Sequence, residues 1–154
     1  MLVIGIGNDF RRDDGCGREV ARRLRERFPE VATIVECDGE VAHLLGLWRS
    51  RRRVIVVDAI RSGSPAGTVR RIVPRGDDLM RATRGAGSTH GLSLAQALGL
   101  ADALGRRPDR FELIGIEGAD YEVGPGLSPE VEAAAERVVE LLGAELAGRP
   151  AGPE

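Results

Sequence analysis

Residues 54–57, with the sequence Val-Ile-Val-Val, constrain the fold of this chain more than any other segment. A run that is uniformly apolar and β-branched is typical of a central strand in a parallel sheet covered on both faces. Strand-type and helix-type patterns then alternate along the whole chain, which favours crossover connections through helices. The sequence therefore predicts an α/β fold, a three-layer sandwich with a mainly parallel, twisted sheet between helices.

The remaining elements follow from the spacing of apolar residues. Strands are expected at residues 2–6, 31–36, 68–73 and 111–116, with 68–73 at a sheet edge and its direction open to being antiparallel, because it contains arginines and precedes Pro74. Helices are expected around 20–28, from Glu40 to before Arg51, from Leu92 to near Gly105, and from Pro129 onward with Ser128 as N-cap.

The length of 154 residues is that of one domain. We expect residues 1–147 to form a single α/β domain and residues 148–154 to be a disordered tail. The glycine- and arginine-rich segment 75–89 is predicted to be a mobile, functional loop. The first apolar run is too short for a signal peptide, and no run approaches the ~18 residues of a membrane span, so a cytoplasmic protein without membrane contact is expected.

Charge and residue usage exclude several classes of function. The net charge of -2 gives no general reason to expect binding to nucleic acid or anionic membrane. All 22 basic residues are arginine, which excludes a Schiff-base lysine and a Walker-type lysine. Cys16 and Cys37 lie in no metal or disulfide motif, so both are expected to be small apolar core residues.

The first strand leads into a loop that begins like a dinucleotide-binding fingerprint. Gly5 and Gly7 have the right spacing, but Phe10 stands where the third glycine belongs, so a nucleotide-binding domain becomes an unfavoured alternative. The loop instead presents Asp13 and Asp14 where a helix begins. Acidic groups do not cradle a phosphate, whereas they suit a cation.

Side chains that can act as metal ligands or catalytic groups also follow the other predicted strands. Asp38 follows the second strand, Asp58 follows the third, and His90 closes the loop before the third helix. Ligands bind beyond the carboxyl ends of parallel strands, and several carboxylates held together there need protonation or a cation. Aspartate oxygens with one histidine nitrogen suit a borderline ion such as zinc or nickel, with open positions for water or substrate.

Structural alternatives exist for each of these residues. Asp14 has the position of a helix N-cap, Asp38 and Asp58 are common turn formers, and His90 can cap its own helix. His43 lies between apolar positions of the second helix and is expected to be a partly buried, hydrogen-bonded histidine rather than a ligand. Most arginine clusters are expected on solvated faces, whereas Arg11 and Arg12 flank the acidic loop and are candidates for substrate contact or charge balance.

Several segments together resemble the hydrogenase maturation proteases, endopeptidases that remove a C-terminal extension from the large subunit of nickel-iron hydrogenases. The matching segments are Gly5-Ile6-Gly7-Asn8, Arg12-Asp13-Asp14-Gly15-Cys16-Gly17, Asp38-Gly39, residues 54–58, Ser88-Thr89-His90-Gly91-Leu92 and Gly126-Leu127-Ser128-Pro129-Glu130-Val131. They span nearly the whole chain, and their combination is specific although each segment alone is weak.

The resemblance implies a five-stranded sheet and a metal-contacting set of Asp14, Asp58 and His90. It further implies that nickel arrives bound to the precursor large subunit, the expected partner, and that zinc or cadmium can substitute for it. Asp38 or Asp14 is expected to assist an attacking water. Asn8 and Asp13 are expected to support the loop without touching metal.

Two departures from the family pattern keep an alternative open. Glu40 stands where a small residue is usual, and Gly118-Ala119-Asp120 replaces a proline-containing turn. Either departure can change which hydrogenase is accepted. The alternative function is a nickel-site sensor or chaperone of the same fold that does not cleave its partner.

Overall fold

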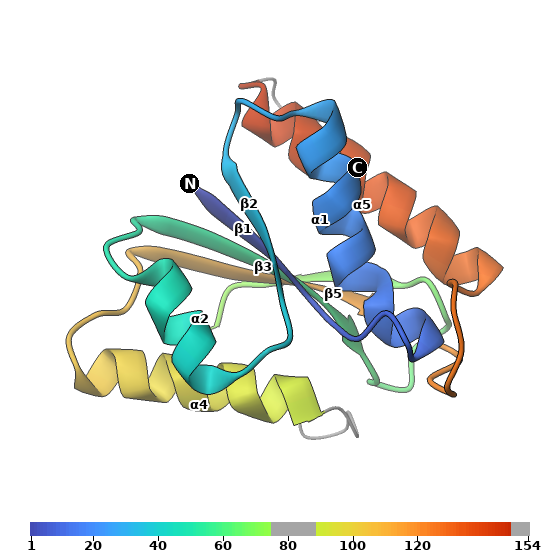
Figure 1. Ribbon diagram of the computed structural model, residues 1–154, viewed down its shortest axis with the longest axis horizontal. Helices are drawn as coiled ribbons and strands as arrows, with labels where there is room; N and C mark the ends of the chain where they lie inside the picture. The colour runs from blue at the N-terminus through green and yellow to red at the C-terminus, as the bar shows by residue number, and fades with distance from the viewer. Residues whose placement is uncertain (75–88, 149–154) are drawn as a thin grey trace.

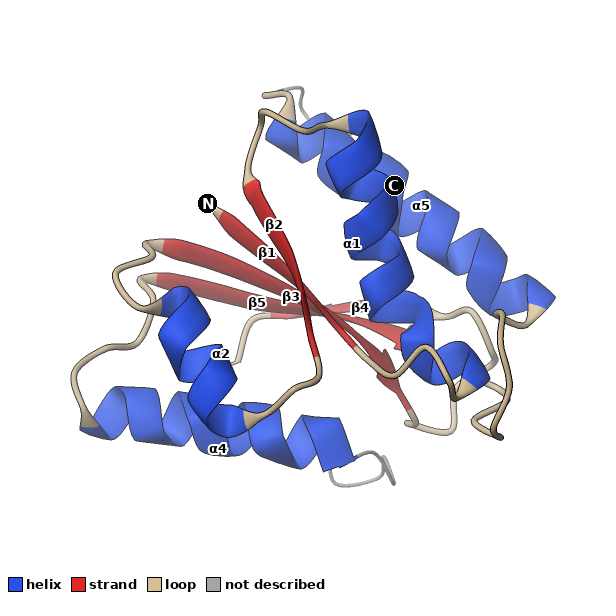
Figure 2. Cartoon of the chain, in the orientation of Figure 1, coloured by secondary structure: helices blue, strands red, loops and turns tan. Residues whose placement is uncertain are grey.

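The computed structural model describes residues 1–74 and 89–148, with side chains from residue 93 onward in the second range. The predicted mobile loop therefore lies, up to residue 88, outside the described residues, as does the predicted tail from residue 149. The described chain forms a five-stranded sheet in the order β2-β1-β3-β5-β4. Figure 1 shows this sheet between two layers of helices, and Figure 2 shows the same arrangement by type of element.

The strands form a mainly parallel sheet, as predicted. They are β1 (Leu2–Ile6), β2 (Thr33–Cys37), β3 (Arg53–Ile60), β4 (Val69–Ile72) and β5 (Arg110–Glu117). Neighbouring strands are parallel except for β4, which pairs antiparallel with β5 at the edge of the sheet. The mainly parallel five-stranded sheet and the edge position of β4 are thus confirmed.

The helices cover both faces of the sheet. They are α1 (Cys16–Arg27), α2 (Val41–Trp48), α4 (Thr89–Ala103) and α5 (Pro129–Leu146), and a 3-10 turn, η1 (Arg12–Gly15), precedes α1. Figure 1 shows α1 and α5 side by side on one face and α2 and α4 on the other, which agrees with the contacts between these helices. Among the described residues, no helix is long and apolar enough to cross a bilayer.

Strand β3 is the centre of the core, as its uniformly apolar sequence predicts. Ile55 and Val57 point into the cluster that contains α1 and α5, whereas Val54 and Val56 point into the cluster that contains α2 and α4. The strand is longer than predicted, because β5 continues to pair with it as far as Ile60 opposite Glu117. Asp58 therefore lies within β3, opposite Gly115, and does not follow the strand as the sequence suggested.

Helix α1 lies unusually close to the sheet, and Gly17 makes this possible. A Cβ added at Gly17 would collide with the main-chain oxygens of Ile6 and Val57, the last paired region of β1 and β3. Gly5 faces the same contact from the sheet, because its own Cβ would meet the Gly17 carbonyl. The close approach holds the beginning of α1, and the turn before it, against the carboxyl ends of the strands.

We expect Gly17→Ala to lower the free energy of unfolding by at least about 2 kcal/mol, because neither backbone can yield without shifting the helix. The matched control is Gly46→Ala in α2, where an added Cβ has no neighbour within 4 Å. That control should be neutral or gain about 0.5–1 kcal/mol from lost unfolded-state entropy. Urea denaturation of both variants measures the difference, and equal stabilities would contradict the close approach.

Candidate functional site

The neighbouring strands β1, β2 and β3 bring predicted site residues to the same end of the sheet, where their carboxyl ends lie. Ile6 pairs with Cys37, and Gly5 pairs with Val57, so Asp58 lies at the level of Ile6 on the other side of β1. Ile6 and Cys37 belong to the core cluster beneath α2 and α4. Side chains alternate along β3, so Asp58 points to this same face.

Asp13 is completely buried at this edge and is a structural anchor. Its Oδ2 accepts hydrogen bonds from the backbone nitrogens of Ala119 and Asp120, each at 2.8 Å. The backbone nitrogen of Ser128 donates to Oδ1 at 2.7 Å, and the Ser128 hydroxyl donates to Oδ2 at 2.9 Å. Burial alone would raise the pKa of Asp13, but these donors outweigh it and hold the pKa below its usual value.

The supporting roles predicted for Asn8 and Asp13 are confirmed. Asn8 Oδ1 accepts from the backbone nitrogen of Phe10 at 3.0 Å, which holds the loop after β1 in a tight turn. Ser128 occupies the predicted N-cap position of α5, but its side chain makes no cap hydrogen bond and bonds to Asp13 instead. The loop after β1 and the start of α5 are thereby fixed to each other.

Asp14 and Asp58 form a buried pair of carboxylates next to this anchor. Their exposed fractions are 6% and 3%. Burial raises the pKa of Asp58 well above its usual value, and the negative charge of Asp14 raises it further, against a hydrogen bond from the Ala59 nitrogen to Asp58 Oδ1 at 2.8 Å. Two buried like charges that interact in this way fit a site for a cation, which relieves their repulsion.

His90 falls in the first turn of α4, which begins at Thr89, and not in the preceding loop. Figure 1 shows the start of α4 on the side of the molecule to which the strand ends point. The helix covers the face toward which Asp58 is directed. The side chain of His90 lies outside the described residues, so the structure brings together two members of the predicted set of three and fixes the backbone of the third.

Asp38 has different surroundings from the Asp14 and Asp58 pair. Its side chain is 72% exposed, and its Oδ1 accepts from the backbone nitrogen of Glu40 at 3.1 Å. That hydrogen bond is the main reason why the pKa of Asp38 lies below its usual value. Its role in activating a water stays a prediction.

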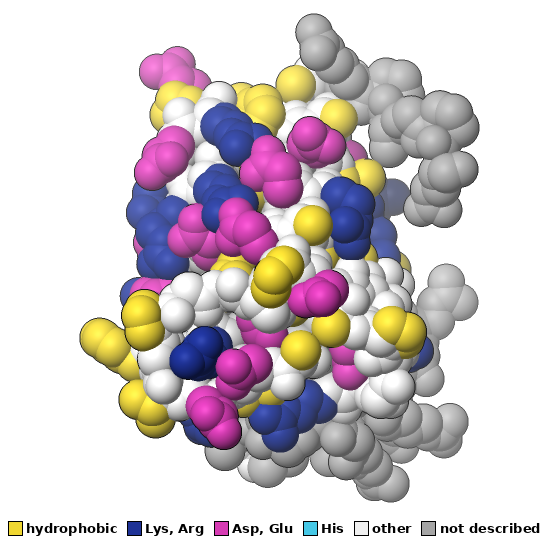
Figure 3. All heavy atoms as spheres, turned by 90° about the vertical axis from the view of Figure 1, so that its right-hand side faces the viewer, with side chains coloured by type: hydrophobic (Ala, Val, Ile, Leu, Met, Phe, Trp, Pro, Cys, Tyr) yellow, Lys and Arg dark blue, Asp and Glu magenta, His cyan; other side chains and the backbone are white. Residues whose placement is uncertain are grey.

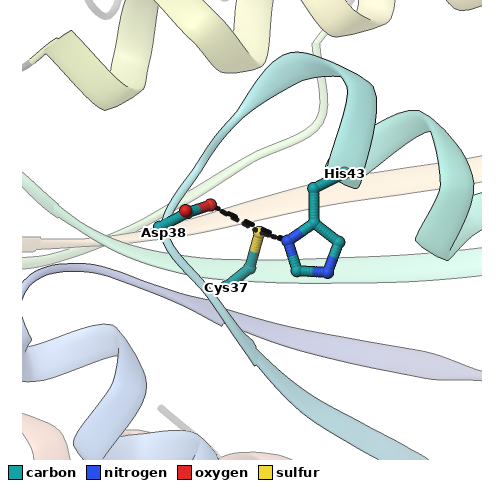
Figure 4. A group of neighbouring side chains, drawn as sticks. All are labelled: Cys37, Asp38 and His43. Atoms are coloured by element: carbon teal, nitrogen blue, oxygen red, sulfur yellow. Dashed lines mark hydrogen bonds and ion pairs between the residues drawn. The ribbon is translucent and has the colours of Figure 1, made fainter.

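The residues around Asp38 agree only in part with the sequence-based expectation. Figure 4 shows Asp38 with Cys37 and His43, whose Nδ1 lies 3.4 Å from Cys37 Sγ. The His43 side chain is 49% exposed, so it is a partly buried histidine with a hydrogen-bond partner, as expected. Cys37 is buried as predicted, but it has polar neighbours.

Both departures from the family pattern have local structural roles. The Glu40 carboxylate caps α2 by accepting from the backbone nitrogens of Ala42 at 3.3 Å and His43 at 3.2 Å. The turn Gly118-Ala119-Asp120 supplies two of the donors that hold Asp13. Each departure from the family pattern therefore has a structural role within this chain, and neither role involves a partner.

The arginine clusters are solvated and paired, as predicted. Arg22 bonds to Asp9 at 2.8 Å, and Arg23 bonds to Glu132 at 2.6 Å across α1 and α5. Figure 3 shows acidic and basic side chains interspersed over the face that carries α5. Arg11 donates to the Tyr121 carbonyl at 3.2 Å, and Arg12 lies 3.4 Å from the Asp120 carboxylate, so both help to hold the loop to its own chain.

Sequence patterns missed two features of this edge. Cys37 and His43 are six residues apart, which matches no short metal motif, and only the turn between β2 and α2 brings them together. Glu117, one residue beyond the strand predicted at 111–116, is a buried carboxylate at the end of β5. It accepts from the backbone nitrogens of Ser62 and Gly63 and so holds the turn after β3.

The fold and the site together define a class: α/β proteins with a buried carboxylate pair at the carboxyl edge of a parallel sheet. The family model of HycI, described as hydrogenase maturation protease, matches residues 18–145. The Hydrogenase 2 maturation protease of Escherichia coli K12 is 31% identical over 149 residues, covering 95% of this chain and 90% of that protein.

Solved structures agree with the sequence comparison. The hydrogenase maturating endopeptidase HybD from Escherichia coli is similar with a TM-score of 0.78 and 29% identity, over 96% of this chain and 93% of that chain. The maturation protease HycI from Thermococcus kodakarensis KOD1 is similar with a TM-score of 0.69 and 29% identity, over 95% and 91% of the two chains. The chain belongs to the hydrogenase maturation protease family and is a peptidase.

We expect Asp13→Asn to lower the free energy of unfolding at neutral pH by about 2–4 kcal/mol, because the amide nitrogen replaces an acceptor among backbone donors. The lowered pKa of Asp13 stabilises the fold above the unfolded-state pKa, and this stabilisation is lost as pH falls through the folded-state pKa. The difference between wild type and variant should therefore narrow in urea titrations as the pH falls below about 5 and through the folded-state pKa.

Asp109→Asn is the control for this measurement, because Asp109 is exposed and pairs with exposed Arg52 at 3.3 Å. Such a surface pair contributes about 0–1 kcal/mol. A loss in Asp13→Asn no larger than in this control would contradict the anchoring role.

Proposed function

We propose that this protein is the endopeptidase that removes the C-terminal extension of a nickel-loaded hydrogenase large-subunit precursor. The observation that carries the proposal is the buried pair of Asp14 and Asp58, in which the negative charge of Asp14 disfavours the ionised form of Asp58 and a cation between them would relieve that repulsion. In this proposal the cation is the nickel that the substrate already holds. Zinc or cadmium in the same substrate position would be a substitute.

Asp14, Asp58 and His90 would then complete the coordination of an ion bound mainly by the precursor. Two buried carboxylates and an imidazole, without a thiolate, are a donor set that suits a borderline divalent ion and leaves positions for substrate ligands. Recognition of the precursor and detection of its metal become one event, because the ion relieves the repulsion between Asp14 and Asp58. Cleavage in this way acts as a checkpoint on nickel insertion.

The chain must also supply a group that takes a proton from the attacking water. Asp14 is at the pair itself, whereas Asp38 is ionised and exposed on the neighbouring strand end. Either carboxylate can act as the general base in this proposal. We further propose that the reaction takes place in the cytoplasm, since Cys16 and Cys37 are both free thiols, as is usual in a reducing compartment.

Asp14→Asn, Asp58→Asn and His90→Ala should each reduce cleavage of a nickel-loaded precursor by at least about 100-fold, because each removes a ligand worth several kcal/mol. The aspartate variants keep the size of the side chain and remove one of two buried like charges, so their far-UV circular dichroism should stay unchanged. The assay follows shortening of the precursor by gel and mass spectrometry.

Asp109→Asn serves again as the control and should cleave at the wild-type rate. Asp109 directly precedes β5 and so lies at the amino end of that strand, away from the carboxyl ends that carry the site. Full activity in all three site variants would exclude the pair from the reaction. A wild-type protein that binds the nickel-loaded precursor but never shortens it would instead support the alternative, a sensor or chaperone that does not cleave.

The surface beside the carboxylate pair is suited to contact with the precursor. Phe10 and Val123 are 78% and 84% exposed. Their loops are joined by the hydrogen bond from the Gly124 nitrogen to the Phe10 carbonyl at 2.9 Å, and by a bridge between Arg11 and Gly124. Two exposed apolar side chains on a loop that also presents the site favour docking of a protein substrate.

Phe10→Ser should raise the KM for the precursor by about 10-fold while leaving kcat within about twofold, because it removes apolar contact area without touching the carboxylates. Leu104→Ser is the matched control, an exposed apolar residue after α4 at the far edge of the sheet, and should leave both constants unchanged. An unchanged KM in Phe10→Ser, or an equal effect of both variants, would argue against docking at this loop.

A further inference from the structure

A second group of ligand-type atoms lies at the end of β2, outside the Asp14 and Asp58 pair. Cys37 Sγ is 3.4 Å from His43 Nδ1 and 3.8 Å from Asp38 Oδ1, and Nδ1 and Oδ1 are 3.7 Å apart. Figure 4 shows the imidazole with Nδ1 toward the sulfur and Nε2 away from it. A thiol, an imidazole and a carboxylate therefore point to one small volume.

The three distances are close to those of a tetrahedral metal site. Bond lengths of about 2.0–2.3 Å to zinc at tetrahedral angles place the ligand atoms about 3.3–3.6 Å from one another. The observed separations between the Cys37, Asp38 and His43 atoms need changes of only a few tenths of an ångström to reach these values. Rotation of the exposed Asp38 and His43 side chains is sufficient for this adjustment.

The backbone around the group supplies the outer hydrogen bonds that metal ligands usually have. The Gly39 nitrogen donates to Cys37 Sγ at 3.3 Å, an arrangement that stabilises negative charge on sulfur. Gly39 has a φ of 87°, a backbone conformation that favours glycine in this turn. The Glu40 carboxylate fixes the backbone of His43, and the Glu40 nitrogen fixes Asp38 Oδ1.

The group of Cys37, Asp38 and His43 is open to solvent and lies apart from Asp58. Cys37 is buried, whereas Asp38 and His43 are exposed, so a fourth position would face solvent. Cys37 and Asp58 lie on strands separated by β1, which places the two strand positions about 10 Å apart. A single ion cannot be shared between them.

We propose that Cys37, Asp38 and His43 form a metal site for a thiophilic divalent ion such as zinc, with three protein ligands and one open position. The donor set of sulfur, nitrogen and oxygen favours zinc or cobalt over magnesium or calcium. Burial holds the pKa of the Cys37 thiol above its usual value, so the free protein carries the proton on sulfur. Binding forms the metal–sulfur bond and releases this proton to solvent, without any change of oxidation state.

The bound ion would join the end of β2 to the first turn of α2. Since the ion binds only when these segments have their folded arrangement, it should stabilise the protein by mass action. None of its ligands belongs to the Asp14, Asp58 and His90 set, and only Asp38 is shared with the proposed cleavage reaction, as one of its two candidate general bases.

Titration of the reduced, metal-free, full-length protein with Co²⁺ tests the proposal. We expect a thiolate-to-cobalt charge-transfer band and visible bands of tetrahedral cobalt that saturate near about one equivalent, with displacement by Zn²⁺ and a rise in melting temperature. Cys37→Ser should abolish the charge-transfer band. His43→Ala should weaken cobalt binding by about 10-fold or more.

Two controls make the result specific. Cys16→Ala, which removes the other thiol, should retain the charge-transfer band. The double variant Asp14→Asn and Asp58→Asn should also retain it, and this outcome separates the site from the proposed active site. No precursor is used, so success or failure here is independent of whether the protein cleaves.

The absence of a charge-transfer band in the wild type would overturn the proposal and leave the group as a hydrogen-bonded cap on α2. Retention of the band in Cys37→Ser, or its loss in Cys16→Ala, would overturn it as well. If circular dichroism shows that Cys37→Ser is unfolded, His43→Ala decides the question, because His43 is half-exposed and its removal leaves no core cavity. Unchanged cobalt affinity in His43→Ala then counts against the site.

Discussion

The buried carboxylate of Asp13 fixes the arrangement on which the rest of the site depends. Its oxygens accept from the turn at Ala119 and Asp120 and from the start of α5 at Ser128. Segments more than a hundred residues apart in sequence are thereby held to one side chain. A buried charge is stable only with such a set of donors, so the turn η1 and the beginning of α1 have little freedom to move. The position of Asp14 follows from this anchor.

Adjacent residues at this edge have opposite roles because their environments differ. Asp13 is surrounded by hydrogen-bond donors, which favour its ionised form. Asp58 is buried and close to the charge of Asp14, and both conditions oppose its ionisation. The surroundings of Asp13 therefore stabilise its charge, whereas those of Asp58 oppose a charge there.

In the turn between β2 and α2, the sequence pattern predicts where the elements end but not which side chains meet. The glycine in Asp38-Gly39 and the cap at Glu40 mark where β2 ends and α2 begins, and both elements form there. The pattern did not reveal that Cys37 and His43 face each other, since their meeting depends on the direction of α2. It also placed Asp58 after its strand, because the added length of β3 comes from pairing with β5, a partner more than fifty residues away.

The sequence by itself determined the class of fold and the edge position of β4, and it predicted Asp14, Asp58 and His90 as metal ligands. Apolar periodicity and turn residues are local properties, so they can be recognised in the sequence without knowledge of the tertiary structure. Only the tertiary structure decided that donors hold Asp13 and that the charge of Asp14 acts on Asp58. Burial and hydrogen bonding depend on what distant segments bring, as the donors at residues 119–128 do for Asp13. Asp13 and Asp14 are identical in type and adjacent in sequence, and only their neighbours in space distinguish them.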